Sequence, residues 1–569
     1  MKEKRVKLLF ALFFLGMVVL FSRSFHLQIL DHHKYTSEVQ NLATRIIRIS
    51  PKRGNIYDRN GKLLAWNQRI YRITNLGSTL DQEIEDELYY ILKDFVDNPY
   101  TVIDRLNFQK RVNLEINSIA AQKIANLDKN LIVEERYVRK YAHESLYHLL
   151  GYVDNEGTAR SGLELVFDKQ LRGSPGFSMI NTAFNKSLNP SLQNVPPING
   201  NNIFLTIDLD LQIKAYEYLN EKEYKGTVIL SNPNNGEILV FVSAPSPDPN
   251  AFSQGMTNLE FQNILNNSNK PLLNRVTSSL YPPGSILKPF VAYGALEAGI
   301  SPEATILSTG KYYLRNSQGT IIGSYSDWKN AGHGETNLVK SLRASVNSYY
   351  YWLGEELGIE HLKVIADKFE IDKKTGIIVP NEKSGIFPDP EWKRANFNTI
   401  WYPGETLLTY IGQGYVTLTP LQVLRIYNIF ATKGDYYQFD LFLKEENIFG
   451  ETVKKRESIL QDSYPMNEEY LEYIYQGMIE VTTFRGSQVE DAGTAYNSFY
   501  DFPYVVAGKT GTAEVSGGKL SHSWFAGFLP ADDPQYSIVV LIENGGQGST
   551  AAAPIARKIL DDLASKYLN

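Results

Sequence analysis

The segment Tyr281-Pro-Pro-Gly-Ser-Ile-Leu-Lys-Pro289 places a serine and a lysine three residues apart behind a sharp turn. Pro and Gly suit a turn into a helix, and Pro289 is tolerated only if the helix starts close to Ser285. Ser285 and Lys288 then share one face of that helix. A serine hydroxyl needs an adjacent base to act as a nucleophile, and a lysine in a desolvated pocket loses its proton readily. The segment therefore predicts a serine activated by a lysine.

The Ser-x-x-Lys spacing alone is weakly specific, because it recurs at Ser308–Lys311, Ser326–Lys329 and Ser516–Lys519, in segments that contain Gly or lie in likely loops. A second motif, Ser345-Val-Asn347, lies in a predicted helical region. Its hydroxyl is suited to relaying a proton, and its amide to orienting the lysine and a substrate amide. On its own, this second motif also fits an ordinary polar helix turn.

A third motif, Lys509-Thr-Gly-Thr512, continues an apolar strand that starts at Tyr504. A strand that lines a groove binds an extended peptide by adding it to the sheet. The lysine charge and the threonine hydroxyls suit a carboxylate, and Gly511 leaves space for a substrate backbone. Gly508-Lys-Thr510 also imitates the end of a phosphate-binding loop, but Pro503 stands where the first glycine of that loop belongs. We therefore interpret the motif as part of a peptide-binding strand.

Predicted strands flank the serine segment on both sides. Strands are predicted at 203–207, 226–231, 238–243, 504–514, 523–529 and 536–543, and helices at 209–218, over most of 288–430 and at 551–568. Strands, then helices, then strands with a closing helix indicate one α/β (α+β) domain over residues 196–569, in which helices cover a mixed sheet.

The amino-terminus predicts where the protein resides. Basic residues dominate positions 1–7, and residues 8–21 follow without a charge. That run is short for a bilayer, which needs about 20 residues, but Lys7 and Arg23 can snorkel at its ends. No Ala-x-Ala-like cleavage site follows, which favours an uncleaved anchor over a signal peptide. The positive-inside rule then predicts a cytoplasmic tail, a transmembrane helix at 8–25 and an exported remainder.

Residues 31–195 mix short strand-like and helical stretches and contain no catalytic constellation. A segment rich in Asn, Pro and Ser at 181–202 is typical of a linker. We therefore expect residues 31–195 to form an elongated, non-catalytic α+β domain, called the pedestal below.

Composition excludes several classes of function. The chain has 569 residues, a net charge of −6 and no cysteine. The lack of a basic excess argues against binding nucleic acid. The lack of cysteine excludes disulfides, thiolate metal sites and cysteine nucleophiles.

Ser-x-x-Lys, Ser-x-Asn and Lys-Thr-Gly, in this order, resemble the penicillin-recognising serine transferase superfamily. Further segments are similar to class B penicillin-binding proteins, namely Arg53-Gly-Asn-Ile-Tyr-Asp-Arg-Asn-Gly61, Gly162-Leu-Glu164, Leu171-Arg-Gly173, Asn274-Arg275 and Tyr281-Pro-Pro-Gly-Ser285. Others resemble the elongation type, the penicillin-binding protein 2 subfamily, namely Gly332-His-Gly334, Trp401-Tyr-Pro-Gly404, Ile411-Gly-Gln-Gly414 and Thr419-Pro-Leu-Gln422. The resemblance covers almost the whole chain.

The resemblance implies a D,D-transpeptidase that cross-links peptidoglycan during cell-wall elongation and cell-shape maintenance. Ser285 would attack the D-Ala-D-Ala carbonyl of a donor stem peptide, with Lys288 as the general base. The other implied catalytic residues are Ser345, Asn347 and Lys509, and the implied substrate-binding residues are Thr510, Gly511 and Thr512. The backbone N–H groups of Ser285 and Thr512 would form the oxyanion hole. β-Lactam antibiotics would be trapped as slowly resolving acyl-enzymes.

The resemblance implies no soluble cofactor. Some elongation-type relatives carry a zinc ion near Gly-His-Gly, bound by His, Asp residues and a Cys inside the Ser-x-Asn motif. Asp327 and His333 are present here, but Val346 fills the Cys position and a second aspartate is not evident. Two ligands are too few for a closed zinc site. We therefore expect no metal and interpret His333 as a structural residue that forms hydrogen bonds.

The resemblance also implies location and partners. The protein would be a single-pass protein of the cytoplasmic (inner) membrane, with its catalytic domain on the outer or periplasmic face. Its partners would be a SEDS-family glycosyltransferase and the scaffold of the rod complex, both docking on the pedestal. No glycosyltransferase domain of its own is expected, because residues 31–195 carry no fitting motif.

Two other classes of function stay open at this point. A hydrolase with the same serine, either a D,D-carboxypeptidase or a β-lactamase, would need a group that activates water. The sequence identifies no such group, and nothing in it places Glu405 near Ser285. A β-lactam sensor or assembly scaffold would need further spans or a cytoplasmic effector, and the predicted tail has about seven residues.

Overall fold

The computed structural model describes residues 2–35, 44–181, 195–487, 492–515 and 517–568. The chain separates into two compact units, Met1–Arg53 with Arg172–Gly200 and Gly54–Leu171 with Asn201–Asn569. Each unit is described by itself. Most of the predicted linker at 181–202 lies outside the described residues.

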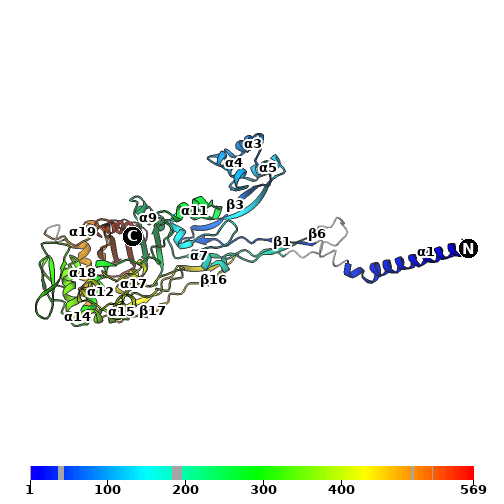
Figure 1. Ribbon diagram of the computed structural model, residues 1–569. Coiled ribbons are helices and arrows are strands. Elements are labelled where there is room, and N and C mark those ends of the chain that lie inside the picture. Colours follow the sequence, from blue (N-terminus) through cyan, green and yellow to red (C-terminus); the bar gives the residue numbers. More distant parts are fainter. Residues whose placement is uncertain (1, 36–43, 182–194, 488–491, 516, 569) are drawn as a thin grey trace. The chain divides into compact units, whose positions relative to one another are not determined.

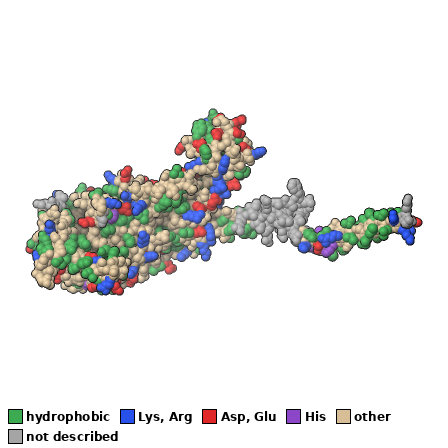
Figure 2. All heavy atoms as spheres, in the orientation of Figure 1, with side chains coloured by type: hydrophobic (Ala, Val, Ile, Leu, Met, Phe, Trp, Pro, Cys, Tyr) green, Lys and Arg blue, Asp and Glu red, His purple; other side chains and the backbone are tan. Residues whose placement is uncertain are grey.

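The first unit contains a long apolar helix. Helix α1 (Lys2–Phe25) continues into a π-helical turn at His26–Leu30. Together, Glu3–Leu30 form a stretch of 28 residues that is long and apolar enough to cross a membrane and is not buried in the protein. Hydrophobic side chains cover it along its length (Figure 2). The predicted anchor at 8–25 lies within this helix.

The same unit contains a two-stranded antiparallel ribbon. Strand β1 (Thr44–Ile49) pairs with β6 (Gly176–Asn181), so segments more than a hundred residues apart in sequence meet in one ladder. The chain thus leaves this unit after Arg53 and returns to it at Arg172.

The second unit holds a seven-stranded mixed sheet in the order β16-β15-β7-β2-β3-β4, with β5 also paired to β3. Its strands are β2 (Ile56–Tyr57), β3 (Leu63–Asn75), β4 (Arg111–Leu114), β5 (Leu131–Tyr141), β7 (Asn202–Leu205), β15 (Phe442–Glu446) and β16 (Thr452–Lys455). The parallel pair β2–β7 joins residues of the predicted pedestal to residues of the predicted catalytic domain. This sheet therefore contains strands from both predicted domains.

Three helices cover one end of the long β3–β5 ladder (Figure 1). They are α3 (Gln82–Leu92), α4 (Pro99–Phe108) and α5 (Ser118–Leu127). A small core of its own holds this lobe together, with Leu88, Ile103 and Ile124 among its buried residues.

A five-stranded antiparallel sheet, in the order β18-β19-β20-β8-β9, lies within the predicted catalytic domain. Its strands are β8 (Gly226–Ser231), β9 (Ile238–Ala244), β18 (Ala507–Ala513), β19 (His522–Leu529) and β20 (Tyr536–Ile542). The strands predicted at 226–231 and 238–243 pair with those predicted near the carboxy-terminus, through β20 and β8. Strand β18, which carries the Lys-Thr-Gly motif, lies at the edge of this sheet.

Alternating side chains of this sheet bury two faces, as the two-residue period of a strand requires. On one face, Val228 and Leu230 belong to a cluster that includes residues of α9 (Leu209–Asn220) and α20 (Ala552–Tyr567). On the other face, Ile229 and Val539 belong to a cluster that includes residues of α12 (Lys288–Glu297), α17 (Pro420–Ala431) and α18 (Glu468–Thr483). Residues that adjoin the three motifs, Ile286, Tyr349 and Ala513, belong to this second cluster.

The middle of the chain is mostly helical, but residues 306–336 contain short strands. The helices there are α12, α13 (Leu338–Arg343), α14 (Asn347–Lys368), α15 (Pro390–Phe397), α16 (Pro403–Tyr410) and α17. Four short strands, β10 (Ile306–Ser308), β11 (Lys311–Arg315), β12 (Ile321–Ser326) and β13 (Gly334–Thr336), were not predicted. The turn Asn316–Gly319 joins β11 to β12, and such a Gly-containing turn between short runs signals a hairpin.

Candidate active site

Ser285 lies where a tight turn enters a helix, as the sequence predicts. Residues Gly284–Leu287 form one 3₁₀ turn that leads directly into α12. The Gly284 N–H donates to the Gly412 carbonyl (2.8 Å), and Gly284 has φ +58°, which favours glycine. The Ser285 side chain is half-buried, and its hydroxyl has no hydrogen-bond partner among the described residues. The Ser285 hydroxyl is thus partly accessible and is not held by a hydrogen bond from the described residues.

Lys288 brings the first two motifs together. Its side chain is fully buried, and Nζ donates to the Ser345 carbonyl (2.8 Å), to Asn347 Oδ1 (2.8 Å) and to Ser345 Oγ (3.3 Å). The Tyr350 ring lies beside the same nitrogen, with its centroid 5.0 Å away. The Ser-x-Asn motif therefore supplies the hydrogen-bond partners of Nζ among the described residues.

The electrostatics of the site favour a neutral lysine near neutral pH. Burial lowers the pKa of Lys288 to about 7, against a smaller opposing effect of the Asp327 charge. Burial also holds the pKa of Lys509 well below its ordinary value, and the neighbouring Lys288 charge acts in the same direction. A buried, deprotonated lysine is a competent general base.

Ser345 lies between two helices rather than inside one. It follows α13 and precedes α14, and its φ of +54° is in the left-handed region that non-glycine residues rarely adopt. Asn347 is the first residue of α14, and the intervening Val346 is its N-cap. The predicted helical region is therefore interrupted at this motif, and the interruption turns both polar side chains toward Lys288.

The Lys-Thr-Gly motif lies on β18, as predicted. The Lys509 side chain is buried and donates to the Thr510 carbonyl (3.1 Å). The Thr510 and Thr494 hydroxyls are 2.6 Å apart, and the exposed Thr512 accepts a hydrogen bond at Oγ1 from the Gly548 N–H (3.3 Å). Because β18 is an edge strand, its outer side is suited to pairing with an extended peptide.

The structure adds a second reason for glycine at position 511, beside the predicted one. A Cβ atom there would lie 2.9 Å from Ile286 Cγ2, 3.1 Å from Trp524 Cβ and 3.3 Å from the Ile286 nitrogen. The missing side chain thus admits the turn that carries Ser285. The close approach of β18 to this turn places the third motif beside the first.

Two residues that contact the Lys-Thr-Gly motif were not predicted from the sequence. Thr494 belongs to no motif, and only the fold brings its hydroxyl to Thr510. Gly548 supplies a backbone N–H to Thr512, and a Cβ atom at Gly548 would lie 2.5 Å from the Gly511 carbonyl oxygen. No local signal in the sequence points to either contact.

The residues near Gly-His-Gly do not fit a zinc ion. His333 Nε2 lies 3.6 Å from Asp327 Oδ1 and has no hydrogen-bond partner among the described residues. Two of the candidate zinc ligands therefore lie close together. However, both carboxylate oxygens of Asp327 already accept backbone N–H groups, and Val346 offers no donor atom. No cluster of three or more His, Cys, Asp or Glu residues suited to a metal occurs in the described part of the chain. The His333 backbone N–H donates to the Ser308 carbonyl (3.1 Å).

The Glu405 carboxylate is held by hydrogen bonds to residues outside the three motifs. It accepts hydrogen bonds from Lys393 Nζ and from the Tyr402 N–H, which it caps at the start of α16. These bonds leave it poorly suited to activating a water molecule at Ser285.

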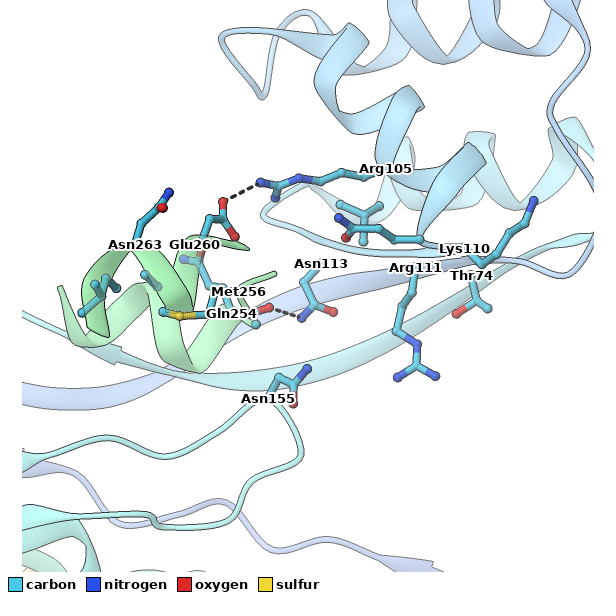
Figure 3. A pocket seen from close by; sticks show the side chains of 15 residues that line it. Thr74, Arg105, Lys110, Arg111, Asn113, Asn155, Gln254, Met256, Glu260 and Asn263 are labelled. Atoms are coloured by element: carbon cyan, nitrogen blue, oxygen red, sulfur yellow. Dashed lines mark hydrogen bonds and ion pairs between the residues drawn. The ribbon is translucent and has the colours of Figure 1, made fainter. Parts of the chain in front are cut away.

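The second unit also has a polar hollow of about 740 Å³ away from the three motifs (Figure 3). It lies between the α3–α5 lobe and α10 (Pro249–Gln254) with α11 (Asn258–Leu265). Arg105 and Glu260 form an ion pair across it (3.6 Å), and Asn113 Nδ2 donates to the Gln254 carbonyl (3.1 Å). None of the predicted site residues lines this hollow.

Two family models match the chain. Residues 226–561 match the Penicillin binding protein transpeptidase domain, and residues 48–205 match the Penicillin-binding Protein dimerisation domain.

Individual relatives match over nearly the full length. Peptidoglycan D,D-transpeptidase MrdA of Haemophilus influenzae is 32% identical over 617 residues, covering 98% of this chain and 91% of that protein. The penicillin-binding protein PBP2 of Helicobacter pylori, solved in complex with MreC, has a TM-score of 0.74 and 29% identity and covers 92% of this chain and 100% of its own. A chain from a peptidoglycan synthase complex that coordinates polymerization and crosslinking has a TM-score of 0.70 and 26% identity and covers 98% and 97%.

Proposed function

Since the chain belongs to the penicillin-binding protein family, with a dimerisation domain followed by a transpeptidase domain, we propose that it is a peptidoglycan D,D-transpeptidase acting through an acyl-serine intermediate. One observation carries the site assignment. Lys288 Nζ is buried, bonded to Ser345 and Asn347, and one helical turn from Ser285.

These positions support the following acylation step. Ser285 Oγ attacks the carbonyl carbon of the penultimate D-Ala while Lys288 takes the hydroxyl proton. The oxyanion accepts hydrogen bonds from the backbone N–H groups of Ser285 and Thr512, and each such donor is typically worth about 3 kcal/mol. Ser345 relays the proton to the leaving nitrogen, the C–N bond breaks, and the terminal D-Ala departs as an amine. Asn347 holds Lys288 and the donor peptide in place.

Recognition of the donor's carboxylate falls to β18. Lys509, Thr510 and Thr512 present an amine and hydroxyls along one strand, and the outer side of the edge strand β18 is suited to pairing with the extended peptide. An amine from a second stem peptide then attacks the acyl-enzyme. Because Glu405 is held by Lys393 and Tyr402, we assign resolution to an acceptor amine rather than to water. β-Lactams would acylate the same serine.

The remaining parts of the chain support a proposal for the location of the protein and for its partners. We propose a transmembrane anchor at 8–25, a pedestal at 31–195 and a catalytic domain at 196–569 outside the cytoplasmic membrane, with a role in elongation. The apolar stretch at Glu3–Leu30 supports a single-pass anchor. The relatives solved with MreC and within a peptidoglycan synthase complex support a rod-complex scaffold and a SEDS-family glycosyltransferase as partners.

Intact-protein mass spectrometry of the full chain in detergent, incubated with benzylpenicillin, tests this proposal. We expect one stable adduct, mapped to the peptide that contains Ser285, and none in the Ser285→Ala variant. Ser326→Ala, which alters a Ser-x-x-Lys copy in the exposed strand β12, is the matched control and should label normally. Labelling of another serine would contradict the site, and rapid loss of the adduct would favour a hydrolase.

A further inference from the structure

We propose that Asp327 is a positioning residue, whose carboxylate, together with the adjacent Trp328 indole, holds the turn that presents Ser345 and Asn347 to Lys288. The proposal rests on the assignment of Lys288 as the general base. It gives this buried acid a task that requires no metal ion.

The carboxylate holds the turn from its carboxy-terminal side. Oδ1 accepts the Asn347 N–H (3.1 Å), and Oδ2 accepts the Ser348 N–H (3.0 Å) and the Ser348 hydroxyl (2.8 Å). The first N–H groups of a helix have no partner within the helix, and an anion is favoured there. Val346, the N-cap of α14, provides no side-chain cap. Asp327, twenty residues upstream, therefore caps α14 in its place.

The next residue holds the turn from its amino-terminal side. The Trp328 indole N–H donates to the Ala344 carbonyl (3.0 Å), at the end of α13. Two consecutive residues thus hold both ends of a turn in which Ser345 adopts a left-handed φ of +54°. Strained backbone of this kind persists only where surrounding contacts fix it. Asp327 and Trp328, together called the clamp, supply such contacts.

Asp327 is itself held rigidly and acts on Lys288 through its charge. Its side chain is fully buried, and its Oδ1 accepts the Trp328 N–H (3.0 Å). Burial alone would raise its pKa, but these donors, His333 and the Lys288 charge hold that pKa well below the ordinary value, so Asp327 stays ionised. The groups facing the Lys288 ammonium are Asp327, Lys509 and the Tyr350 ring. Loss of the Asp327 charge should therefore lower the pKa of Lys288.

Asp327→Asn in the full chain is the main test, read out as the rate of benzylpenicillin acylation across pH. We expect acylation to slow by about tenfold to a hundredfold, the usual effect of misplaced reacting groups. We also expect the acid limb of the pH–rate profile, where the acylation rate rises with pH, to move to lower pH. The control is Asp208→Asn, which alters another buried carboxylate that caps a helix, α9, through the N–H groups of Asp210 and Leu211. That variant should lose thermal stability and keep the wild-type acylation rate and pH profile.

Trp328→Phe keeps the Asp327 carboxylate and removes only the indole N–H donor. It is therefore the second test variant, to be used if Asp327→Asn does not fold. It should slow acylation about threefold to tenfold, the worth of one hydrogen bond, with the acid limb unmoved. Wild-type acylation by either folded variant, or an unmoved acid limb in Asp327→Asn, would overturn the proposal. Failure of the wild-type chain to form a Ser285 adduct would instead overturn the proposed function.

Discussion

Lys288 Nζ lies 2.8 Å from Asn347 Oδ1, across 59 residues of sequence. The contact joins the helix that follows the nucleophile candidate to the first residue of α14. An amide oxygen accepts a hydrogen bond from the charged and the neutral lysine alike, so this bond holds Nζ in place in both protonation states. The base is thereby oriented without being locked in its charged form.

The pH dependence of acylation should report this lysine. Burial lowers the pKa of Lys288 to about 7, and only the neutral amine can take a proton from Ser285. The acylation rate should therefore rise as pH increases through about 7 and level off above it. Rapid-quench measurements with benzylpenicillin from pH 5.5 to 9 would show the limb, with circular dichroism confirming the fold at each pH. A rate that is flat or falls over this range would contradict the assignment.

Carboxylate recognition should depend on Lys509. Its side chain is buried on β18, and a hydrogen bond to a charged group contributes about 1.5–3 kcal/mol. Lys509→Ala should therefore reduce the second-order rate constant of acylation by about a hundredfold for benzylpenicillin. For a benzylpenicillin ester, in which the carboxylate is masked, the same substitution should reduce the rate constant much less. Lys519→Ala, an exposed lysine near the same strand, is the matched control and should behave as wild type.

Gly511 should tolerate no side chain. A Cβ atom would lie 2.9 Å from Ile286 Cγ2 and 3.3 Å from the Ile286 nitrogen, so Gly511→Ala must displace the serine turn or β18. We expect acylation to fall by about a hundredfold, since a shift near 1 Å of reacting groups has an effect of this size. Gly294→Ala in α12 is the control, because its Cβ would meet Ile365 at an ordinary distance of 3.4 Å. It should acylate normally and unfold no more readily than wild type. Normal acylation by Gly511→Ala would show that this close approach is dispensable.

Local sequence patterns predicted the parts of the site that depend on local geometry. The turn and helix start at Ser285 follow from Pro and Gly spacing, and the strand that carries Lys509 follows from its apolar run. Contacts between distant segments carry no such pattern. Thr494 and Asp327 meet their partners only because α13, α14 and β18 are packed by the fold. The hairpin at 311–326 was missed because exposed strands lack a strong apolar alternation.

The left-handed backbone of Ser345 allows stability and catalysis to be separated. At φ +54° a Cβ atom is strained by about 1–2 kcal/mol, whereas glycine adopts this conformation freely. Ser345→Gly and Ser345→Ala both delete the hydroxyl that lies 3.3 Å from Lys288 Nζ and both retain the carbonyl acceptor. Ser345→Gly should therefore be more stable to urea than Ser345→Ala by about 1 kcal/mol.

Acylation should fall in both Ser345 variants to a similar extent, about a hundredfold, because the proton relay is lost in each. The control is the pair Asn398→Gly and Asn398→Ala at the end of α15, where φ is +52° and the side chain is exposed. That pair should show the same order of stability with wild-type acylation. If Ser345→Gly were the less stable variant, the turn would not be strained. If either Ser345 variant acylated at the wild-type rate, the hydroxyl would not be the relay, and the clamp around the turn would serve Asn347 alone.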